Sequence, residues 1–275
     1  MTSAPDELVT LDIDDPVAVV TLRRPDKLNA FTHPMLRALE QAVADAADDR
    51  RVVGIVITAE GRGFSAGLDA DALAAASAAA SNGDEGANTP PPSGEHRPGL
   101  FSYLLETPKP IIAAVNGVAA GGGFVLAAKC DLRFAAASAS FVTVFSKRGL
   151  IAEHGLSYLL PRQVGLGDAL DLLWSSRRLD AAEAKELGFA QRVVGDDDLL
   201  DAACDYVRAL AAEVSPASLA DTKRLLYAHA GTSIDTAFEE ADMATYQALE
   251  RPDATEGVAS LLERRAPDFD RLGTR

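Results

Sequence analysis

Two glycine-rich turns carry backbone groups that could do chemistry. The first, residues 61–73 (GRGFSAGLDADAL), follows a predicted strand and contains three small residues in a row, Ser65, Ala66 and Gly67. Small side chains let a ligand approach the backbone, and a helix start offers unpaired N–H groups. The second turn lies in residues 115–131, where three glycines separate a predicted strand from a predicted helix. The N–H groups of Gly122 and Gly123 could therefore face an anion or a developing oxyanion, although tight packing alone is the alternative.

Other reaction classes fit the sequence poorly. The pattern GxGxxG is not matched. No Gly-Lys-Ser or Gly-Lys-Thr follows either turn, which disfavours an NTPase. Ser65 has neither a G-x-S-x-G context nor a suitable base, which disfavours a serine hydrolase. His33, His96 and His229 are scattered, and we expect them at a helix start, in a loop and on a helix face. We find no constellation of metal ligands and expect no metal.

Composition limits the class of protein further. The 275 residues are 48% apolar and 24% charged, as in a folded soluble protein of one or two domains. The two cysteines have no paired spacing, which indicates a reducing compartment. A net charge of −15 repels nucleic acid and anionic lipid at long range. No long apolar run and no signal-like start occur, so we expect a cytoplasmic protein without nucleic-acid or membrane partners.

Alternating strands and helices position the two turns. After Thr32 as a cap, apolar residues recur at helical spacing up to Ala46, and a short helix is expected over 122–129. Short runs rich in β-branched or small apolar residues predict strands at 17–21, 52–58, 111–115 and 131–135. This alternation predicts an α/β domain with largely parallel strands.

The pattern changes near residue 198. Helical segments follow without strong strand signals, at about 198–213, 216–229, 233–250 and 254–264. We therefore divide the chain into an α/β core, residues 1–197, and a helical region, residues 198–275. Within the core, residues 70–99 turn from alanine-rich to rich in proline and glycine, which predicts a mobile loop.

Taken in order, four motifs resemble the enoyl-CoA hydratase/isomerase (crotonase) superfamily. They are RPDKLNA at 24–30, GFSAGLD at 63–69, NG at 116–117 with GGG at 121–123, and CD at 130–131. Further matches, LLPR at 159–162, AAEA at 181–184, LG at 187–188, EGV at 256–258 and RAP at 265–267, extend the resemblance over nearly the whole chain. The resemblance implies a spiral of β-β-α units, a C-terminal helical region that trimerises, and an acyl-CoA thioester as substrate.

The resemblance also implies an oxyanion hole made by two backbone N–H groups. By motif position these belong to Ala66 and Gly122. Removing a proton beside a thioester carbonyl places negative charge on its oxygen, and fixed donors there stabilise the enolate more than the ground state.

The CoA moiety is expected on two segments of the chain. By resemblance it lies against the backbone near Lys27 and Leu28, and against Ala66, Leu68 and Asp69. Asp69 could instead cap the helix expected after it. Nearby cations that could meet the CoA phosphates are Arg23, Arg24, Lys27 and Arg62.

One carboxylate is left for proton transfer. Hydratases of the family carry two glutamates, whereas this sequence has Val125 and Phe145 at those positions. Glu153 occupies the place where enoyl-CoA isomerases and ring-isomerising enzymes of phenylacetate breakdown carry a single Glu or Asp. Apolar surroundings would raise its pKa by desolvation. Alternatively Glu153 caps a helix starting near Gly155, and His154 could orient Glu153 or assist as an acid.

These expectations favour an isomerase. One carboxylate can move a proton between two carbons, shifting a double bond into conjugation with the thioester. The alternatives are an enoyl-CoA hydratase or related lyase, and an acyl-CoA-binding paralogue without turnover. We expect no separate cofactor, because CoA is part of the substrate, and a homotrimer or dimer of trimers formed through the helices after residue 198.

Overall fold

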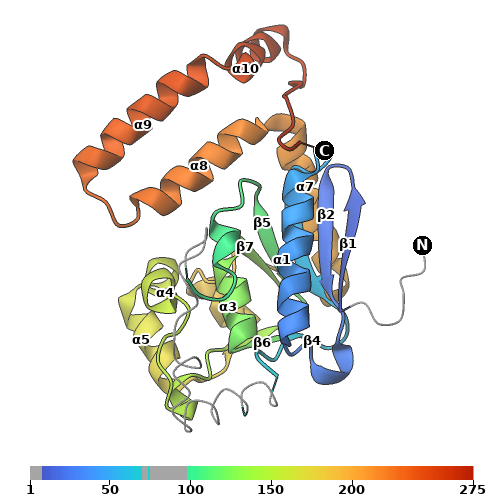
Figure 1. The fold of residues 1–275 in the computed structure, drawn as a ribbon, viewed down its shortest axis with the longest axis vertical. Helices are drawn as coiled ribbons and strands as arrows, with labels where there is room; N and C mark the ends of the chain where they lie inside the picture. The colour runs from blue at the N-terminus through green and yellow to red at the C-terminus, as the bar shows by residue number, and fades with distance from the viewer. Residues whose placement is uncertain (1–7, 70–73, 75–97, 275) are drawn as a thin grey trace.

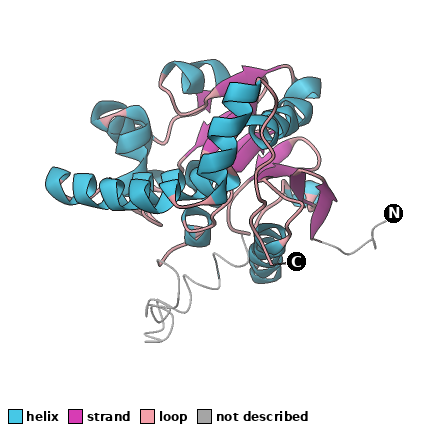
Figure 2. Cartoon of the chain, turned by 90° about the horizontal axis from the view of Figure 1, so that it is seen from above, coloured by secondary structure: helices cyan, strands magenta, loops and turns pink. Residues whose placement is uncertain are grey.

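Two β-sheets surrounded by helices make up the computed structural model, which describes residues 8–69, 74 and 98–274 (Figure 1, Figure 2). The larger sheet has, in spatial order, β1 (Val9–Asp14), β2 (Val17–Leu22), β3 (Gly54–Ala59), β5 (Ile111–Val115), β7 (Leu132–Ala136) and β10 (Arg192–Val194). β1 pairs antiparallel with β2, and every other pair is parallel. β3 and β5 are buried along their whole length, as expected for central parallel strands covered on both faces.

A second, smaller sheet is formed by strands that fall between those of the larger sheet in the order of the chain. It contains β4 (Gly63–Ser65), β6 (Val118–Ala120), β8 (Ser140–Val142) and β9 (Leu179–Asp180). The pairs β3–β4, β5–β6 and β7–β8 each place one strand in the larger sheet and the next in the smaller. This repeat confirms the predicted α/β spiral of β-β-α units.

Helices then cover the sheets. α1 (His33–Asp48) begins as predicted, because the Thr32 hydroxyl accepts a hydrogen bond from the N–H of Met35 at 3.4 Å. α1 packs on β1, β2 and β3, while α7 (Leu199–Glu213) packs on β2, β3, β5 and β7. α3 (Gly122–Lys129) is buried at every residue. The short helices are η1 (Pro25–Lys27), η2 (Ser102–Leu105), η3 (Ser146–Arg148), α6 (Ala181–Glu186) and η4 (Asp196–Asp198).

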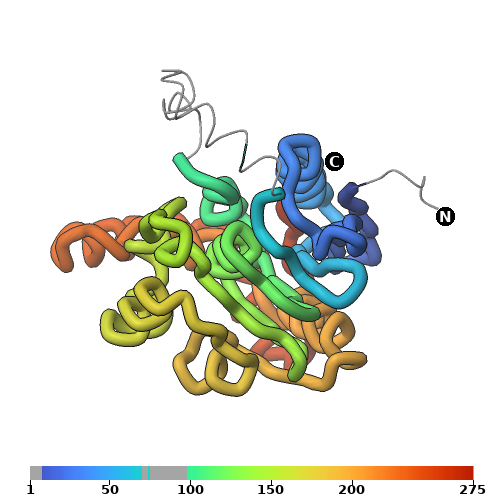
Figure 3. Tube along the Cα trace, turned by 90° about the horizontal axis from the view of Figure 1, so that it is seen from below, coloured from blue at the N-terminus to red at the C-terminus, as the bar shows by residue number. Residues whose placement is uncertain are grey.

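One further helix packs on α3, and another packs on that helix. α4 (Leu156–Val164) contacts α3, and α5 (Leu166–Ser175) packs on α4 (Figure 3). The predicted loop over residues 70–99 lies, apart from residues 74, 98 and 99, outside the described residues. In the part of the chain that is described, no helix is both long and apolar enough to cross a membrane.

From the end of η4 to Glu263 the chain is mainly helical. α8 (Pro216–His229) and α9 (Ile234–Leu249) run beside each other away from the sheets, and α10 (Pro252–Glu263) follows (Figure 1). Residues 264–274 return toward the core, where the N–H of Thr274 donates to the carbonyl of Asp48 at the end of α1 at 3.0 Å.

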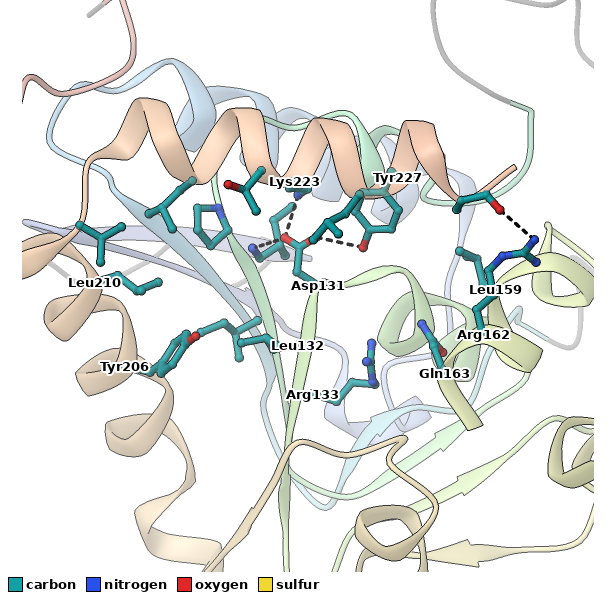
Figure 4. Close-up of a pocket in the computed structure, with 18 of the residues that line it drawn as sticks. Asp131, Leu132, Arg133, Leu159, Arg162, Gln163, Tyr206, Leu210, Lys223 and Tyr227 are labelled. Atoms are coloured by element: carbon teal, nitrogen blue, oxygen red, sulfur yellow. Dashed lines mark hydrogen bonds and ion pairs between the residues drawn. The ribbon is translucent and has the colours of Figure 1, made fainter. Parts of the chain in front are cut away.

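Helices α8, α9 and α10 form what we call the helical arm, and Asp131 links this arm to the larger sheet. Its Oδ2 accepts from the N–H of Ile111 at 2.7 Å and lies 2.8 Å from Nζ of Lys223 on α8. Its Oδ1 accepts from the Tyr227 hydroxyl, also on α8, at 3.0 Å (Figure 4). The Cys-Asp motif therefore has a structural role, joining β5 and α8 through one carboxylate.

Candidate active site

Asn29 joins the first motif, residues 24–30, to the first glycine turn through hydrogen bonds of its side chain. Its side chain is fully buried, and its Nδ2 donates to the carbonyls of Glu60 at 2.9 Å and Gly63 at 2.8 Å. Its Oδ1 accepts from the N–H of Arg24 at 2.7 Å. In the sequence, Asn29 stands out only as part of a motif; asparagine is common in turns because it tolerates a left-handed backbone, and Asn29 has a φ of +53°.

Ser65 adds a further hydrogen bond between the same two segments. Its hydroxyl donates to the carbonyl of Asn29 at 2.8 Å and accepts from the N–H of Gly67 at 3.2 Å. Ser65 is fully buried, so the hydroxyl shapes the turn, in agreement with the poor fit of a serine hydrolase.

The two glycine turns meet at Gly67 and Gly122. Gly67 has φ of +93°, and a Cβ there would stand 2.8 Å from the carbonyl oxygen of Ala120 and 2.9 Å from the nitrogen of Gly122. No side chain fits that space without moving the backbone. The first turn therefore passes directly over the N-terminus of α3.

Ala66 does not supply the predicted oxyanion donor. Its N–H donates to the carbonyl of Leu28 at 2.9 Å, which joins the turn to the segment after η1. An amide already paired inside the protein cannot also bind an oxyanion without breaking that bond. The prediction for Ala66 is therefore wrong by this geometry.

The free amide lies two residues later, at Leu68. Phe31 pairs with this segment as a parallel bridge: its N–H donates to Gly67 at 2.7 Å, and its carbonyl accepts from Asp69 at 3.0 Å. Because successive N–H groups of an extended chain point to opposite sides, the N–H of Leu68 points away from Phe31. Among the described residues, neither it nor the N–H of Gly122, in the first turn of α3, has an acceptor.

Two of the four candidate cations are already paired. Arg23 lies 2.7 Å from Glu60, and Arg24 lies 2.6 Å from Asp69. The helix that Asp69 was expected to cap falls outside the described residues.

Lys27 and Arg62 remain. Both are exposed, and neither side chain has a hydrogen-bond or ion-pair partner in residues 8–69 or 98–274. A Cβ on Gly61 would stand 2.8 Å from Cβ of Pro25, so the segments that carry these two cations touch.

Glu153 is a half-buried carboxylate. No hydrogen bond or ion pair of its side chain is found in the described part of the chain, and burial raises its pKa above the ordinary value of 4.5. Gly155, not Glu153, is the N-cap residue of α4, and Glu153 contacts that helix end through its carbonyl, which accepts from Leu156. The capping alternative is therefore wrong, and the raised pKa agrees with the prediction.

His154 faces elsewhere. Its Nδ1 accepts from the N–H of Leu100 at 3.4 Å, and its ring lines a cavity that also contains Lys129. Burial and the charge of Lys129 lower the pKa of His154, which favours the neutral ring. The contact with Leu100 ties His154 to the segment before η2 rather than to Glu153.

The other histidines follow the expected pattern where the structure describes them. His33 starts α1, and Nε2 of His229 lies 3.1 Å from Glu240 on the surface of the arm. His96 falls outside the described residues. Within the described ranges, no group of three His, Cys, Asp or Glu side chains could hold a metal ion.

A separate groove of about 560 Å³ lies between α8 and the larger sheet (Figure 4). Asp131 and Lys223, paired with each other, line it, as does Arg162, whose Nη2 donates to the carbonyl of Ala230 at 3.0 Å. None of the residues predicted for the active site lines this groove.

Comparison with known proteins identifies the family. The sequence model described as Enoyl-CoA hydratase/isomerase matches residues 12–271. The chain is 36% identical to a protein of Mycobacterium bovis named "Probable enoyl-CoA hydratase", over 92% of this chain and 89% of that protein. It is 34% identical to the 1,2-epoxyphenylacetyl-CoA isomerase of Escherichia coli K12, over 96% of this chain and 98% of the other.

Solved structures agree. An enoyl-CoA hydratase from Polaromonas sp. JS666 superposes with a TM-score of 0.85 at 29% identity, covering 95% of this chain and 99% of that one. A monofunctional enoyl-CoA isomerase from Mycobacterium smegmatis gives a TM-score of 0.68 at 33% identity, covering 84% and 98%. With the fold, the paired glycine turns and these matches together, the chain belongs to the enoyl-CoA hydratase/isomerase family.

Proposed function

We propose that this protein shifts a double bond in an unsaturated acyl-CoA, using Glu153 to move the proton. In a β,γ-unsaturated thioester, the Glu153 carboxylate takes a proton from C2, and the electron pair moves into the carbonyl to form a dienolate. The protonated Glu153 then returns the proton to C4, so the double bond moves from C3–C4 to C2–C3. No water is added, and no cofactor besides the CoA of the substrate is needed.

The observation that carries this proposal is the free state of Glu153. A carboxylate that is half-buried, without a partner among the described residues and with a raised pKa is suited to accept and return a proton. The buried Val125 and Phe145 stand where hydratases carry acids, so no second carboxylate is available at those positions to activate water.

The free amides of Leu68 and Gly122 supply the oxyanion hole in this proposal. Both N–H groups belong to turns that the Gly67–Gly122 contact holds together, so their positions are fixed before substrate binds. The CoA phosphates would meet Lys27 and Arg62, whereas Leu28 and Asp69 shape the segments that carry the turn.

The substitution Glu153→Gln tests the proposed proton transfer. With a β,γ-unsaturated acyl-CoA we expect kcat to fall by about a hundredfold or more, with the thermal transition unchanged. The exposed Glu186 on α6 provides a matched control, since Glu186→Gln is expected to keep full activity. In the wild type, kcat/KM should fall on the acid side at a pH above that of an ordinary glutamate, because only the ionised carboxylate accepts a proton. Full activity of Glu153→Gln would remove Glu153 from the mechanism.

Hydration is the second candidate, because several of the similar proteins are named enoyl-CoA hydratases. A conjugated enoyl-CoA separates the two reactions: release of 3-hydroxyacyl-CoA indicates a hydratase, whereas equilibration with the β,γ-isomer indicates an isomerase. Tight acyl-CoA binding without turnover across a substrate panel would indicate an inactive paralogue instead.

We infer that subunits assemble through the helical arm. α9 and α10 expose large apolar side chains that a monomer would leave in water: Phe238, Met243, Tyr246, Leu249, Val258, Leu261 and Leu262. Large exposed apolar side chains gathered on two helices that contact each other are typical of a subunit interface. A homotrimer or a dimer of trimers would cover them.

A further inference from the structure

Lys129, the last residue of α3, holds a buried ammonium group. The residue is 2% exposed, and its Nζ donates to Oγ of Ser102 at 2.7 Å. An ammonium has three protons to donate, and this is the one hydrogen bond found for it in the described residues. No carboxylate of the described residues lies within ion-pair distance of Lys129, and burial lowers its pKa from 10.5 to about 8. The group is therefore still largely charged at neutral pH.

The ammonium borders a cavity of about 530 Å³ between α3, η2, α4 and α8. Polar side chains gather on its wall: Ser102, Lys129, His154, Tyr158 and Tyr227. The Ser102 hydroxyl is within 3.0 Å of the carbonyls of Pro98 and Gly99, which holds it as an acceptor for Lys129. A Cβ on Gly99 would stand 3.5 Å from Nζ of Lys129, so the backbone at Gly99 lies beside the ammonium.

Lys109 shows what a purely structural buried lysine looks like in this protein. It is 1% exposed, and burial likewise lowers its pKa to about 8. Its Nζ donates to the backbone carbonyls of Ala46 at 3.1 Å and Asp49 at 2.6 Å. Lys109 joins two elements, whereas Lys129 has one neutral hydroxyl and an adjoining cavity.

The cavity borders the C-terminal end of α3, the helix that begins at the proposed oxyanion hole, although Gly122 itself does not line it. Gly122 begins α3 and Lys129 ends it, so they are seven residues, or about 10 Å, apart along the helix axis. Positions 122, 125 and 129 share one face of the helix, and the side chain of Lys129 leans back toward its N-terminus. His154, on the cavity wall, directly follows Glu153 in the chain.

We propose that this cavity receives the far end of the acyl group, and that this end carries a carboxylate which pairs with Lys129. The substrate would then be the CoA thioester of an unsaturated dicarboxylic acid. A carboxylate would use the ammonium protons that have no acceptor among the described residues, and would neutralise a buried charge for which those residues offer no counter-ion. This inference rests on the proposed function, because it takes the thioester to lie at Gly122.

Binding of saturated thioesters tests the inference without any chemistry at Glu153. Titration calorimetry would compare adipyl-, suberyl- and sebacyl-CoA with hexanoyl-, octanoyl- and decanoyl-CoA of the same lengths. At the best-fitting length we expect the wild type to bind the carboxylate-ended thioester at least about tenfold more tightly than its methyl-ended match. We expect Lys129→Met to abolish or reverse that ratio, and Lys129→Arg to keep part of it.

Both thioesters are measured on the same preparation of each variant. The ratio of the two affinities therefore serves as an internal reference for that variant. Lys109→Met is the control for loss of a buried lysine and should leave the ratio unchanged. If Lys129→Met unfolds, Lys129→Gln removes the charge while keeping a polar side chain. Equal binding of both ligands by the wild type, or a preference that survives Lys129→Met and Lys129→Gln, would overturn the inference.

Turnover separates this inference from the proposed function. A carboxylate preference that depends on Lys129, without any double-bond shift, would reject the isomerase and keep the Lys129 site. A double-bond shift that depends on Glu153, without a carboxylate preference, would reject the Lys129 site and keep the isomerase.

Discussion

At the scale of single residues, the direction of one backbone amide decides what the first glycine turn can do. The N–H of Ala66 points into the protein toward Leu28, whereas the N–H of Leu68 points to the open side of the same turn. Residue types do not reveal this difference, because every residue except proline carries the same donor. Only the pairing with Phe31 distinguishes the two amides.

Gly67→Ala tests whether that turn geometry matters. The added Cβ would meet backbone atoms at 2.8 and 2.9 Å, at a φ of +93° that alanine rarely adopts. We expect kcat to fall at least about tenfold, because the turn must move away from Gly122 and misplace the donors. Gly167→Ala in α5 is the control: nothing lies within 4 Å, and alanine favours a helix, so activity should persist. Steady-state kinetics of both variants decide, and unchanged kcat in Gly67→Ala would argue against a fixed oxyanion hole.

Lys129 also makes a prediction about stability and pH. Its folded pKa of about 8 lies below the 10.5 of an unfolded lysine, so below pH 8 the folded state bears the full cost of a buried charge. As pH rises from 8 to 10.5 the unfolded state binds more protons, and this cost disappears. Without ligand, Lys129→Met should therefore raise the free energy of unfolding at pH 7 by up to about 3 kcal/mol, with a gain that shrinks toward pH 10.5. Urea unfolding at pH 7 and 10 measures it, and a constant gain would contradict the assigned pKa.

At the scale of elements, the attachment of α8 depends on one carboxylate. Asp131→Asn leaves Lys223, which is 9% exposed at its side chain, without its ion pair. We expect a loss of about 1 to 3 kcal/mol in the free energy of unfolding and faster amide exchange in α8. Asp205→Asn, which breaks an exposed pair with Arg208, should cost less than about 1 kcal/mol. Equal urea midpoints for the two variants would show that Asp131 does not anchor the arm.

Elements with strong local signals were predictable from the sequence. The helix over 216–229, the helix over 122–129 and the strand over 111–115 have the predicted bounds, and Thr32 caps α1 as expected. β4, β6 and β8 have three residues each, too few for an alternation of apolar and polar side chains to show. Their positions follow from parallel pairing with one another, which only the folded chain displays.

The candidate site was predictable in part, for the same reason. Gly122 and Glu153 stand in motifs, and the structure leaves both the Gly122 amide and the Glu153 carboxylate unpaired among the described residues. Leu68 was expected near CoA, but its free amide depends on the bridge to Phe31. Lys129 gave one weak signal, a cation at the end of the apolar helix GGFVLAAK, and its burial comes from η2 and α4 packing around it.

At the scale of the whole molecule, the exposed apolar face of the arm predicts assembly. Phe238 on α9 is 68% exposed, and Leu261 on α10 is 77% exposed. We expect the wild type to have the mass of three or six subunits in light scattering, and Phe238→Glu to shift it to smaller species. Leu200→Glu, on the core helix α7, should keep the wild-type mass. A wild type whose mass in light scattering is that of a single subunit would contradict the assembly.

The hydrogen bond from Thr274 to Asp48 also constrains the order of events in the cell. Helix α1 leaves the ribosome long before Thr274 is translated, so this contact cannot form until synthesis has passed residue 274. In a nascent chain the Asp48 carbonyl therefore does not yet have Thr274 as a donor. A chain diluted from denaturant that already includes residue 274 has both groups from the start. Folding during synthesis and refolding from denaturant must therefore differ in when the hydrogen bond between Thr274 and Asp48 forms.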